Sequence, residues 1–275
     1  MTTTDFRIVE RGSGPPLVLI PGIQGRWEYS TATVDALSRH FRVVTFSLCD
    51  ERRDRTDADS SDRTIMDVFA DQVERAMDRA GLDRAAIVGV SFGGLVALRF
   101  AATRPSRVSA LVMVSAPGPQ WRLRPRHERY ARLPWIFGPL FVIESPWRLR
   151  HEVVAAVPDR RARFALTCRQ AVIILRAPIS LARLAPRARS IGAYDRTADC
   201  ARVHVPALVV QGEPALDHVT GSGGTADYAR LIPGARLVTI ARTGHLGSIT
   251  RADDCARTIA SFIETATKGS HDSAA

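Results

Sequence analysis

Short, continuous apolar runs recur along this chain and constrain its fold more than any other feature. The runs have four or five residues, are rich in Val, Ile and Leu, and occupy residues 17–20, 42–46, 86–90, 110–114, 207–211 and 237–240. Runs of this length that are apolar on both faces are typical of parallel strands covered by helices. A chain of 275 residues is long enough to build one α/β domain around them.

The segments between these runs carry helical periodicity. Residues 62–80 form one apolar stripe at helical spacing, made by Ile65, Val68, Phe69, Val73, Ala76, Met77 and Ala80. Ser60, Ser61 or Asp62 is expected to cap this helix, and Gly81 to close it. Further helices are predicted over 92–104, stopped by Pro105, and over 224–231 and 253–265.

The strand pattern stops between residues 118 and 204, which we interpret as a helical insertion between two strands. This segment holds 17 arginines and six acidic residues, a net charge of +11, whereas the whole chain carries +10. The excess charge is therefore regional. It is either a solvated helix surface or a surface that attracts an anionic substrate or partner. Residues 268–275 are small and polar, and we expect a disordered tail there.

Location and redox state follow from what the chain lacks. Its first residues have neither the basic flank nor the apolar stretch of a signal peptide, and no apolar run reaches the roughly 18 residues that span a bilayer. We therefore expect a cytoplasmic protein without a membrane span. The four cysteines show no C-x-x-C spacing, so free thiols are expected rather than a zinc site.

The strongest chemical motif is Gly89-Val90-Ser91-Phe92-Gly93, which matches G-x-S-x-G. An apolar strand precedes it and a predicted helix follows it, as a nucleophile on a sharp strand-to-helix turn requires. The glycines leave room for the backbone that such a turn brings close. The pattern predicts that Ser91 is a catalytic nucleophile, because the helix N-terminus favours negative charge developing there.

A serine hydroxyl needs a base and an orienting acid to become a nucleophile. His245, in the loop after the last predicted strand, is the predicted base. Asp217 is the predicted acid, and Glu213, closer to the end of the strand at Gln211, is its rival. The order serine, acid, histidine along the chain supports both assignments.

The oxyanion of a tetrahedral intermediate needs two backbone donors. We expect one to be the N–H of Phe92, directly after the nucleophile. The other is expected from the loop that follows the first core strand, where Ile23 is the first choice and Gln24 the second.

These motifs together resemble the α/β-hydrolase superfamily. The order Pro21-Gly22, the serine motif, Asp217 and Gly244-His245 carries the resemblance, which covers residues 6–263. It implies an α/β-hydrolase fold with a mostly parallel sheet flanked by helices. Its core would be residues 1–117 and 205–267, and residues 118–204 would form a helical cap inserted after the sixth strand.

Two features depart from the family pattern. The oxyanion loop commonly reads His-Gly, and here it reads Pro21-Gly22. The acid commonly lies about three residues after the strand-end glycine, whereas Asp217 lies five after Gly212, which keeps Glu213 open as the acid. The serine nucleophile disfavours cleavage of carbon–halogen and epoxide bonds.

The predicted function is hydrolysis of a carboxylic ester or lactone through an acyl-enzyme, without a metal or organic cofactor. The substrate is expected to be a small or medium hydrophobic molecule. Its pocket is expected to be lined by cap aromatics, drawn from Trp121, Trp135, Phe137, Phe141 and Trp147.

The same triad supports other reactions: carbon–carbon bond hydrolysis, acyl transfer to another acceptor, and cofactor-free haloperoxidase chemistry. A non-catalytic ligand-binding protein on this fold is the alternative from another class. A basic module that binds nucleic acid is not expected, because the basic residues lack an interleaved aromatic pattern. A monomer or homodimer is expected.

Overall fold

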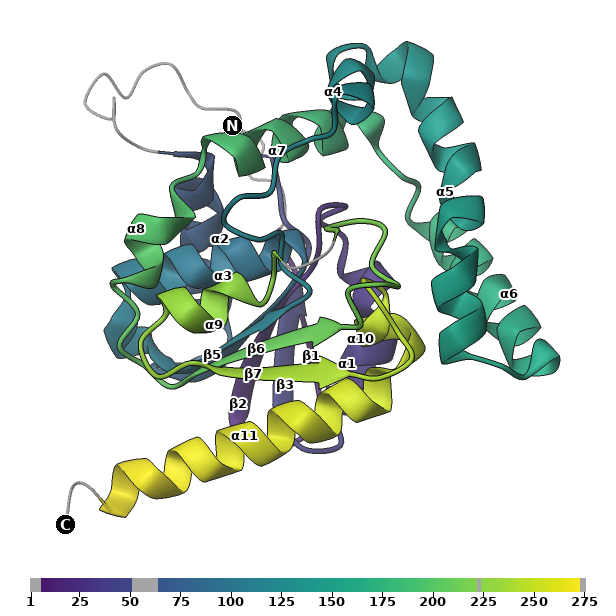
Figure 1. Cartoon of the computed structure of the whole chain (residues 1–275). Coiled ribbons are helices and arrows are strands. Elements are labelled where there is room, and N and C mark those ends of the chain that lie inside the picture. The colour runs from purple at the N-terminus through teal and green to yellow at the C-terminus, as the bar shows by residue number, and fades with distance from the viewer. Residues whose placement is uncertain (1–5, 51–63, 222–223, 273–275) are drawn as a thin grey trace.

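The computed structural model describes residues 6–50, 64–221 and 224–272, and its centre is a twisted sheet (Figure 1). Seven strands form within these residues: β1 (Ile8–Arg11), β2 (Pro16–Ile20), β3 (Arg42–Phe46), β4 (Ala85–Val90), β5 (Val108–Val114), β6 (Ala207–Gly212) and β7 (Arg236–Ile240). Their order is β1-β3-β2-β4-β5-β6-β7. Only β1 runs antiparallel to its neighbour, so the predicted, mostly parallel sheet is confirmed.

Side chains from successive strand residues enter two hydrophobic layers, one on each face of the sheet. Leu17 and Leu19 of β2 face the layer covered by α1 (Thr31–Leu37) and α11 (Ala252–Asp272). Val18 and Ile20 face the layer covered by α2 (Ile65–Arg79), α3 (Phe92–Thr103) and α9 (Asp227–Leu231). Burial on both faces explains why these strands have continuous apolar sequences.

Helix α2 begins at Ile65, the first apolar residue of its stripe. Thr64 caps it, and the side chain of Asp67 accepts the Thr64 backbone N–H at 2.7 Å, which completes a capping box. The caps expected at Ser60, Ser61 and Asp62 lie outside the described residues. Gly81 follows the helix with φ +65°, in agreement with its predicted closing role.

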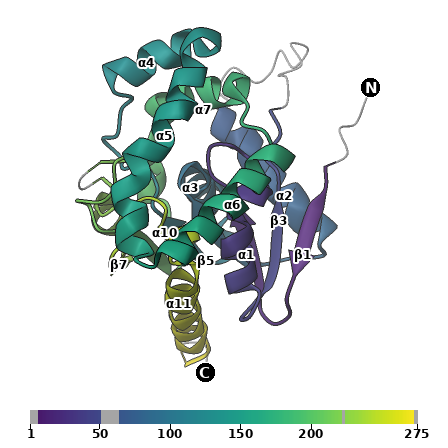
Figure 2. The same ribbon diagram turned by 90° about the vertical axis from the view of Figure 1, so that its right-hand side faces the viewer.

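Five helices lie between β5 and β6, in a segment whose backbone is described throughout. They are α4 (Pro125–Arg132), α5 (Pro134–Ala156), α6 (Arg160–Arg176), α7 (Leu181–Ala193) and α8 (Arg196–Cys200). In Figure 1, α7 lies along the top of the molecule and α5 and α6 along its right-hand side; Figure 2 shows α5 and α6 from that side. We call α4 to α7 the cap. It follows the fifth observed strand rather than the sixth, because one strand fewer than expected forms before it in the described residues.

Three short elements complete the secondary structure of the described residues: the 3-10 turns Trp27–Ser30 and Pro105–Arg107, and α10 (Gly247–Thr250). Helix α11 continues to Asp272, into the tail that the sequence predicted, and residues 273–275 lie outside the described part. Among the described residues, no single helix is long and apolar enough to cross a membrane. The successive helices α6 and α7 are long and apolar enough only when they are counted as one span, and the chain bends by 102° between them.

Candidate active site

Ser91 occupies a strained turn between β4 and α3. Its φ of 53° and ψ of −118° are unusual for a residue with a side chain. The crowding expected around it is present, because a Cβ on Gly89 would lie 2.2 Å from the Gly93 oxygen, and one on Gly93 2.4 Å from the Ile20 oxygen. The turn is fixed to the sheet by a 2.7 Å hydrogen bond from Ser91 N to the Val114 oxygen.

His245 reaches Ser91 from the loop between β7 and α10. Its Nε2 lies 3.0 Å from Ser91 Oγ, within hydrogen-bonding distance although 154 residues separate the two. Its Nδ1 lies 3.5 Å from Asp217 Oδ2, a contact that must shorten to become a well-formed hydrogen bond. Catalytic contacts of this length tighten when substrate binds.

Asp217 is held as a carboxylate by its own loop. Val219 N and Thr220 N donate to Oδ1 at 2.9 and 2.8 Å, and the Thr220 hydroxyl donates to Oδ2. Burial alone would raise the pKa of Asp217, but His245 and Thr220 favour the charged form and lower this pKa to about 2. A negative charge therefore faces the side of His245 opposite Ser91.

Glu213 lies elsewhere. Its Oε1 accepts the backbone N–H of Arg242 at 2.7 Å, and its own N–H donates to the Thr243 oxygen at 2.6 Å. Arg242 has a positive φ of 62°, so Glu213 supports the sharp turn that leads into the histidine loop. The structure thus brings Asp217, and not Glu213, against the imidazole.

The expected oxyanion donors lie beside the nucleophile. A Cβ on Gly22 would lie 3.7 Å from Ser91 Cβ, which places the loop containing Ile23 and Gln24 next to the elbow. The N–H groups of Ile23 and Phe92 donate to no acceptor within the described residues. Phe92 is the first residue of α3, where a free N–H is normal and available to an anion.

Two buried charged residues of the cap, which sequence reasoning missed, hold the loops of this site. Glu152 of α5 is fully buried, and its Oε1 accepts Gly244 N at 2.8 Å, Leu246 N at 2.5 Å and Thr243 Oγ1 at 3.1 Å. Nothing in the sequence marked this residue, because two of its three partners are backbone N–H groups.

Arg187 of α7 is the second of these cap residues. It is also fully buried, and it donates to the Ile23 oxygen at 2.9 Å, the Leu48 oxygen at 3.1 Å and Asp50 Oδ1 at 2.8 Å. Burial lowers the pKa of the guanidinium, and Asp50 opposes that effect. Nothing in the arginine-rich sequence distinguished Arg187 from its neighbours.

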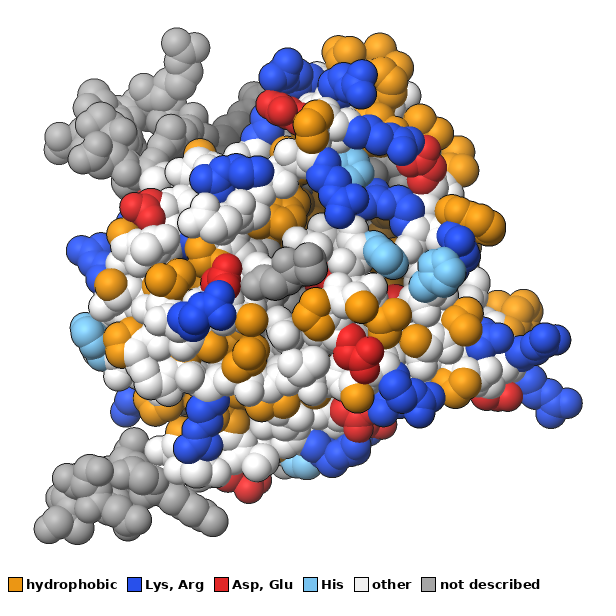
Figure 3. Space-filling model, viewed as in Figure 1, with side chains coloured by type: hydrophobic (Ala, Val, Ile, Leu, Met, Phe, Trp, Pro, Cys, Tyr) orange, Lys and Arg blue, Asp and Glu red, His pale blue; other side chains and the backbone are white. Residues whose placement is uncertain are grey.

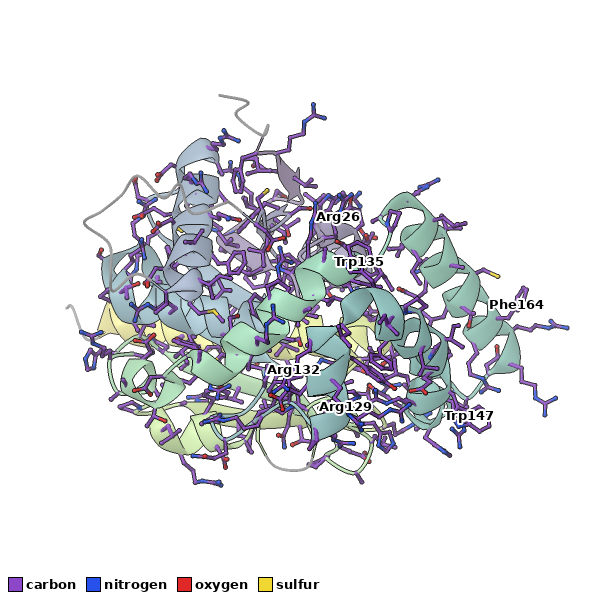
Figure 4. The ribbon with its side chains drawn as sticks, turned by 90° about the horizontal axis from the view of Figure 1, so that it is seen from above. Arg26, Arg129, Arg132, Trp135, Trp147 and Phe164 are labelled. Carbon is purple, nitrogen blue, oxygen red and sulfur yellow. The ribbon has the colours of Figure 1, made fainter. Side chains whose placement is uncertain are left out.

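The predicted aromatic lining of the pocket is wrong for the tryptophans of α5. Trp135 and Trp147 expose 77% and 70% of their surface to solvent, and Figure 4 shows Trp147 at the outer rim of the cap. Phe137 stacks on Tyr130 with ring centroids 5.3 Å apart, and Trp121 packs against the core. The side chain of Phe141 lies outside the described part.

A cavity of about 750 Å³ opens between α2 and α7. Its lining includes Cys49, Asp50, Phe69, Arg183, Ser190 and Tyr194, and no residue of the Ser91–His245–Asp217 group lines it. Asp50 therefore lines this cavity and also binds Arg187, which in turn binds the Ile23 loop.

Comparison with known proteins places the chain in a family. A model described as "alpha/beta hydrolase fold" matches residues 15–138, and one described as "TAP-like protein" matches residues 189–275. The polyketide synthase ThaQ of Burkholderia thailandensis is 28% identical over 94% of this chain, which spans 12% of the length of ThaQ. The pimeloyl-[acyl-carrier protein] methyl ester esterase of Nitrosomonas europaea is 26% identical over 87% of this chain and 92% of its own.

A solved structure agrees in fold. The enol-lactonase of Burkholderia xenovorans LB400 superposes with a TM-score of 0.70 at 22% identity, covering 94% of this chain and 96% of its own. Sheet order, strand-to-helix serine turn and the matched residues all lead to one conclusion: this chain belongs to the α/β-hydrolase superfamily.

Proposed function

We propose that the protein is a serine hydrolase that cleaves a carboxylic ester or lactone. The observation that carries this proposal is the 3.0 Å contact between His245 Nε2 and Ser91 Oγ at a strained strand-to-helix turn. His245 takes the hydroxyl proton as Ser91 attacks the carbonyl carbon, and it later returns this proton to the leaving oxygen. A water molecule activated by the same imidazole then releases the acid.

Asp217 and the N–H groups of Ile23 and Phe92 complete the mechanism. The Asp217 carboxylate stabilises the imidazolium and fixes its orientation. The N–H groups of Ile23 and Phe92 bind the negative oxygen of the tetrahedral intermediate, an interaction that strengthens as the charge develops. Gln24 stays the second choice for the donor from this loop, because its backbone N–H also donates to no acceptor within the described residues.

An ester or lactone substrate is supported by the names of two similar proteins, a methyl ester esterase and an enol-lactonase. A second candidate is an acyl group attached to a carrier protein. Two relatives favour it, because ThaQ is a polyketide synthase and the esterase acts on a carrier-protein ester. The two candidates are distinguished by kcat/KM for one acyl group, presented either on a carrier protein or as a small ester. A higher value for the carrier-bound form favours the second candidate, and a higher value for the small ester favours the first.

The test is labelling with a fluorophosphonate probe, followed by turnover of a panel of aryl esters. Wild type should be labelled and active, whereas Ser91→Ala should be neither. A wild-type protein that is unlabelled and inert against every ester would overturn the hydrolase proposal. Full turnover by Ser91→Ala would show that another residue is the nucleophile.

A further inference from the structure

Glu152 contacts the histidine loop at the two peptide groups that flank the histidine. Gly244 N and Leu246 N, on either side of His245, both donate to its Oε1. We propose that Glu152 is a positioning residue for His245, so that the cap fixes the geometry of the catalytic group below it. This inference rests on the proposed function.

Among the described hydrogen bonds, Gly244 N and Leu246 N have no acceptor other than Glu152 Oε1. The Thr243 hydroxyl lies within hydrogen-bonding distance of the same oxygen and of Thr250 Oγ1, and Glu213 binds only the start of the loop, at Arg242 N and the Thr243 oxygen. Buried donors that lose their acceptor are costly and move to find another. The loop would then shift, and the His245–Asp217 contact, already 3.5 Å long, would open further.

Glu152 acts as a hydrogen-bond acceptor more than as a charge. Its second oxygen, Oε2, is buried without a hydrogen-bond partner in the described residues, so only Oε1 serves the loop. Burial raises the pKa of Glu152, although the bonds from Gly244, Leu246 and Thr243 favour the carboxylate. An amide oxygen accepts the same bonds, so glutamine should replace this residue and aspartate should not.

Arg187 gives the cap a second point of contact, at the loop that contains Ile23. Its guanidinium donates to the carbonyl of Ile23, the residue whose N–H is the expected oxyanion donor, and to Leu48 and Asp50 behind it. A Cβ on Gly25 would lie 2.0 Å from Arg187 Nη1, so the loop is shaped around this side chain. The cap thus holds both the base and the oxyanion loop through one buried side chain each.

The experiment compares Glu152→Gln with Glu152→Asp. Glutamine keeps the reach and loses the charge, while aspartate keeps the charge and withdraws the oxygens by about 1.5 Å. We expect Glu152→Gln to retain kcat within about threefold, and Glu152→Asp to lose about 100-fold in kcat with little change in KM, the effect of a displacement near 1 Å. The acid limb of the pH–rate profile should stay in place in Glu152→Gln.

Controls separate this proposal from folding and from the proposed function. Glu144 lies on the same helix and pairs with Arg126 at the surface, so Glu144→Gln and Glu144→Asp should leave kcat unchanged. Thermal unfolding of each variant checks the fold, and the fluorophosphonate labelling rate reports the Ser91–His245 pair directly. Full kcat in a folded Glu152→Asp, or aspartate outperforming glutamine, would overturn the positioning role. An unlabelled wild type would instead overturn the proposed function.

Discussion

At the scale of single residues, the candidate site depends on close packing around the Ser91 turn and on the hydrogen bonds of a few carboxylates. Ser91 was predictable because G-x-S-x-G encodes a steric requirement that appears directly in the sequence. The choice between Asp217 and Glu213 was not predictable, because both lie on one loop and only its turns decide which carboxylate faces His245. Glu152 was out of reach for a further reason: its partners are backbone groups, which every sequence contains.

The elbow should reject a single methyl group. In Gly93→Ala the new Cβ would lie 2.4 Å from the Ile20 oxygen and 2.5 Å from the Pro21 oxygen, and both are backbone atoms that cannot rotate away. We expect a loss of about 1–3 kcal/mol in the free energy of unfolding and loss of probe labelling. Gly192→Ala on α7, with open space around the new Cβ, is the control and should cost nothing. Equal labelling of both variants would contradict this account of the turn.

The two candidate acids should behave differently on amide substitution. Asp217→Asn removes the negative charge beside His245 and should lower kcat by about 10³–10⁴. Glu213→Gln still accepts the Arg242 N–H and should stay within a few-fold of wild type. Steady-state kinetics on one aryl ester decides the matter, and the reverse ranking would make Glu213 the acid.

The lowered pKa of Asp217 also predicts a pH dependence of stability. The folded value of about 2 lies below the ordinary value of 3.8, so this carboxylate stabilises the fold above pH 4 and the contribution disappears as pH falls towards 2. The contribution is about 2 kcal/mol. Denaturant unfolding at pH 6, 4 and 2.5 should therefore show a smaller decline in Asp217→Asn than in wild type. An equal decline in the free energy of unfolding of both proteins would show that the ionisation of Asp217 does not contribute to stability.

At the scale of elements, the sequence predicted the strands well and the cap poorly. Strands β2 to β6 are buried on both faces, which left no competing interpretation, whereas β7 at the sheet edge was found from its apolar run although most of its residues are exposed. β1 escaped notice because the run Ile-Val-Glu-Arg at the sheet edge is half polar. Helix α6 contains no buried residue although it is rich in apolar side chains, so its pattern could not reveal which face packs.

Helix α5 carries an apolar stripe on its outer side. Ile136, Leu140, Ile143, Trp147 and Val154 follow one another at helical spacing, and all are exposed. Figure 3 shows hydrophobic side chains down the right-hand edge of the molecule, interspersed with arginines. The inner side of the same helix carries Glu152 and Ala156, both buried. Since the apolar stripe faces outward and a charged residue is buried on the inner side, hydrophobic periodicity could not predict which side of α5 packs.

Substitutions on the two sides of α5 should therefore differ in their effect on stability. Trp147→Gln should change the free energy of unfolding by less than about 0.5 kcal/mol and reduce binding of an apolar dye. Ala156→Gln, which forces a polar group into a buried position, should lower the melting temperature by several degrees. Thermal unfolding with dye fluorescence measures both effects. Equal destabilisation would mean that Trp147 is covered in solution.

At the scale of the whole molecule, charge is distributed unevenly. Core arginines are paired: Arg99 contacts Asp67 at 2.7 Å and Asp199 at 3.0 Å, and Arg104 contacts Asp71 and Glu74. Arg160, Arg161 and Arg176 of α6 are exposed and form no ion pair with the described residues. The predicted regional excess of positive charge therefore lies largely on the cap.

This charge should affect the rate at which anionic substrates arrive. For an anionic ester, kcat/KM should fall several-fold as salt rises from about 0.05 to 0.5 M, because the Debye length shrinks from above 10 Å to a few ångströms. A neutral ester of the same acyl group is the control and should show a flat profile. A flat profile for both esters would leave the cap arginines without a role in substrate capture.

The hydrogen bonds of the site also bear on the order of folding. The Ser91–His245 contact joins residues 154 positions apart, and the bond from Gly244 to Glu152 spans 92. Such long loops close late, after helices and neighbouring strands have formed. Probe labelling of Ser91 should therefore return last on refolding and disappear first on partial denaturation, while helical circular dichroism is still near its native value. Labelling of Ser91 by the probe would then distinguish the native state from partly folded states that circular dichroism cannot tell apart from it.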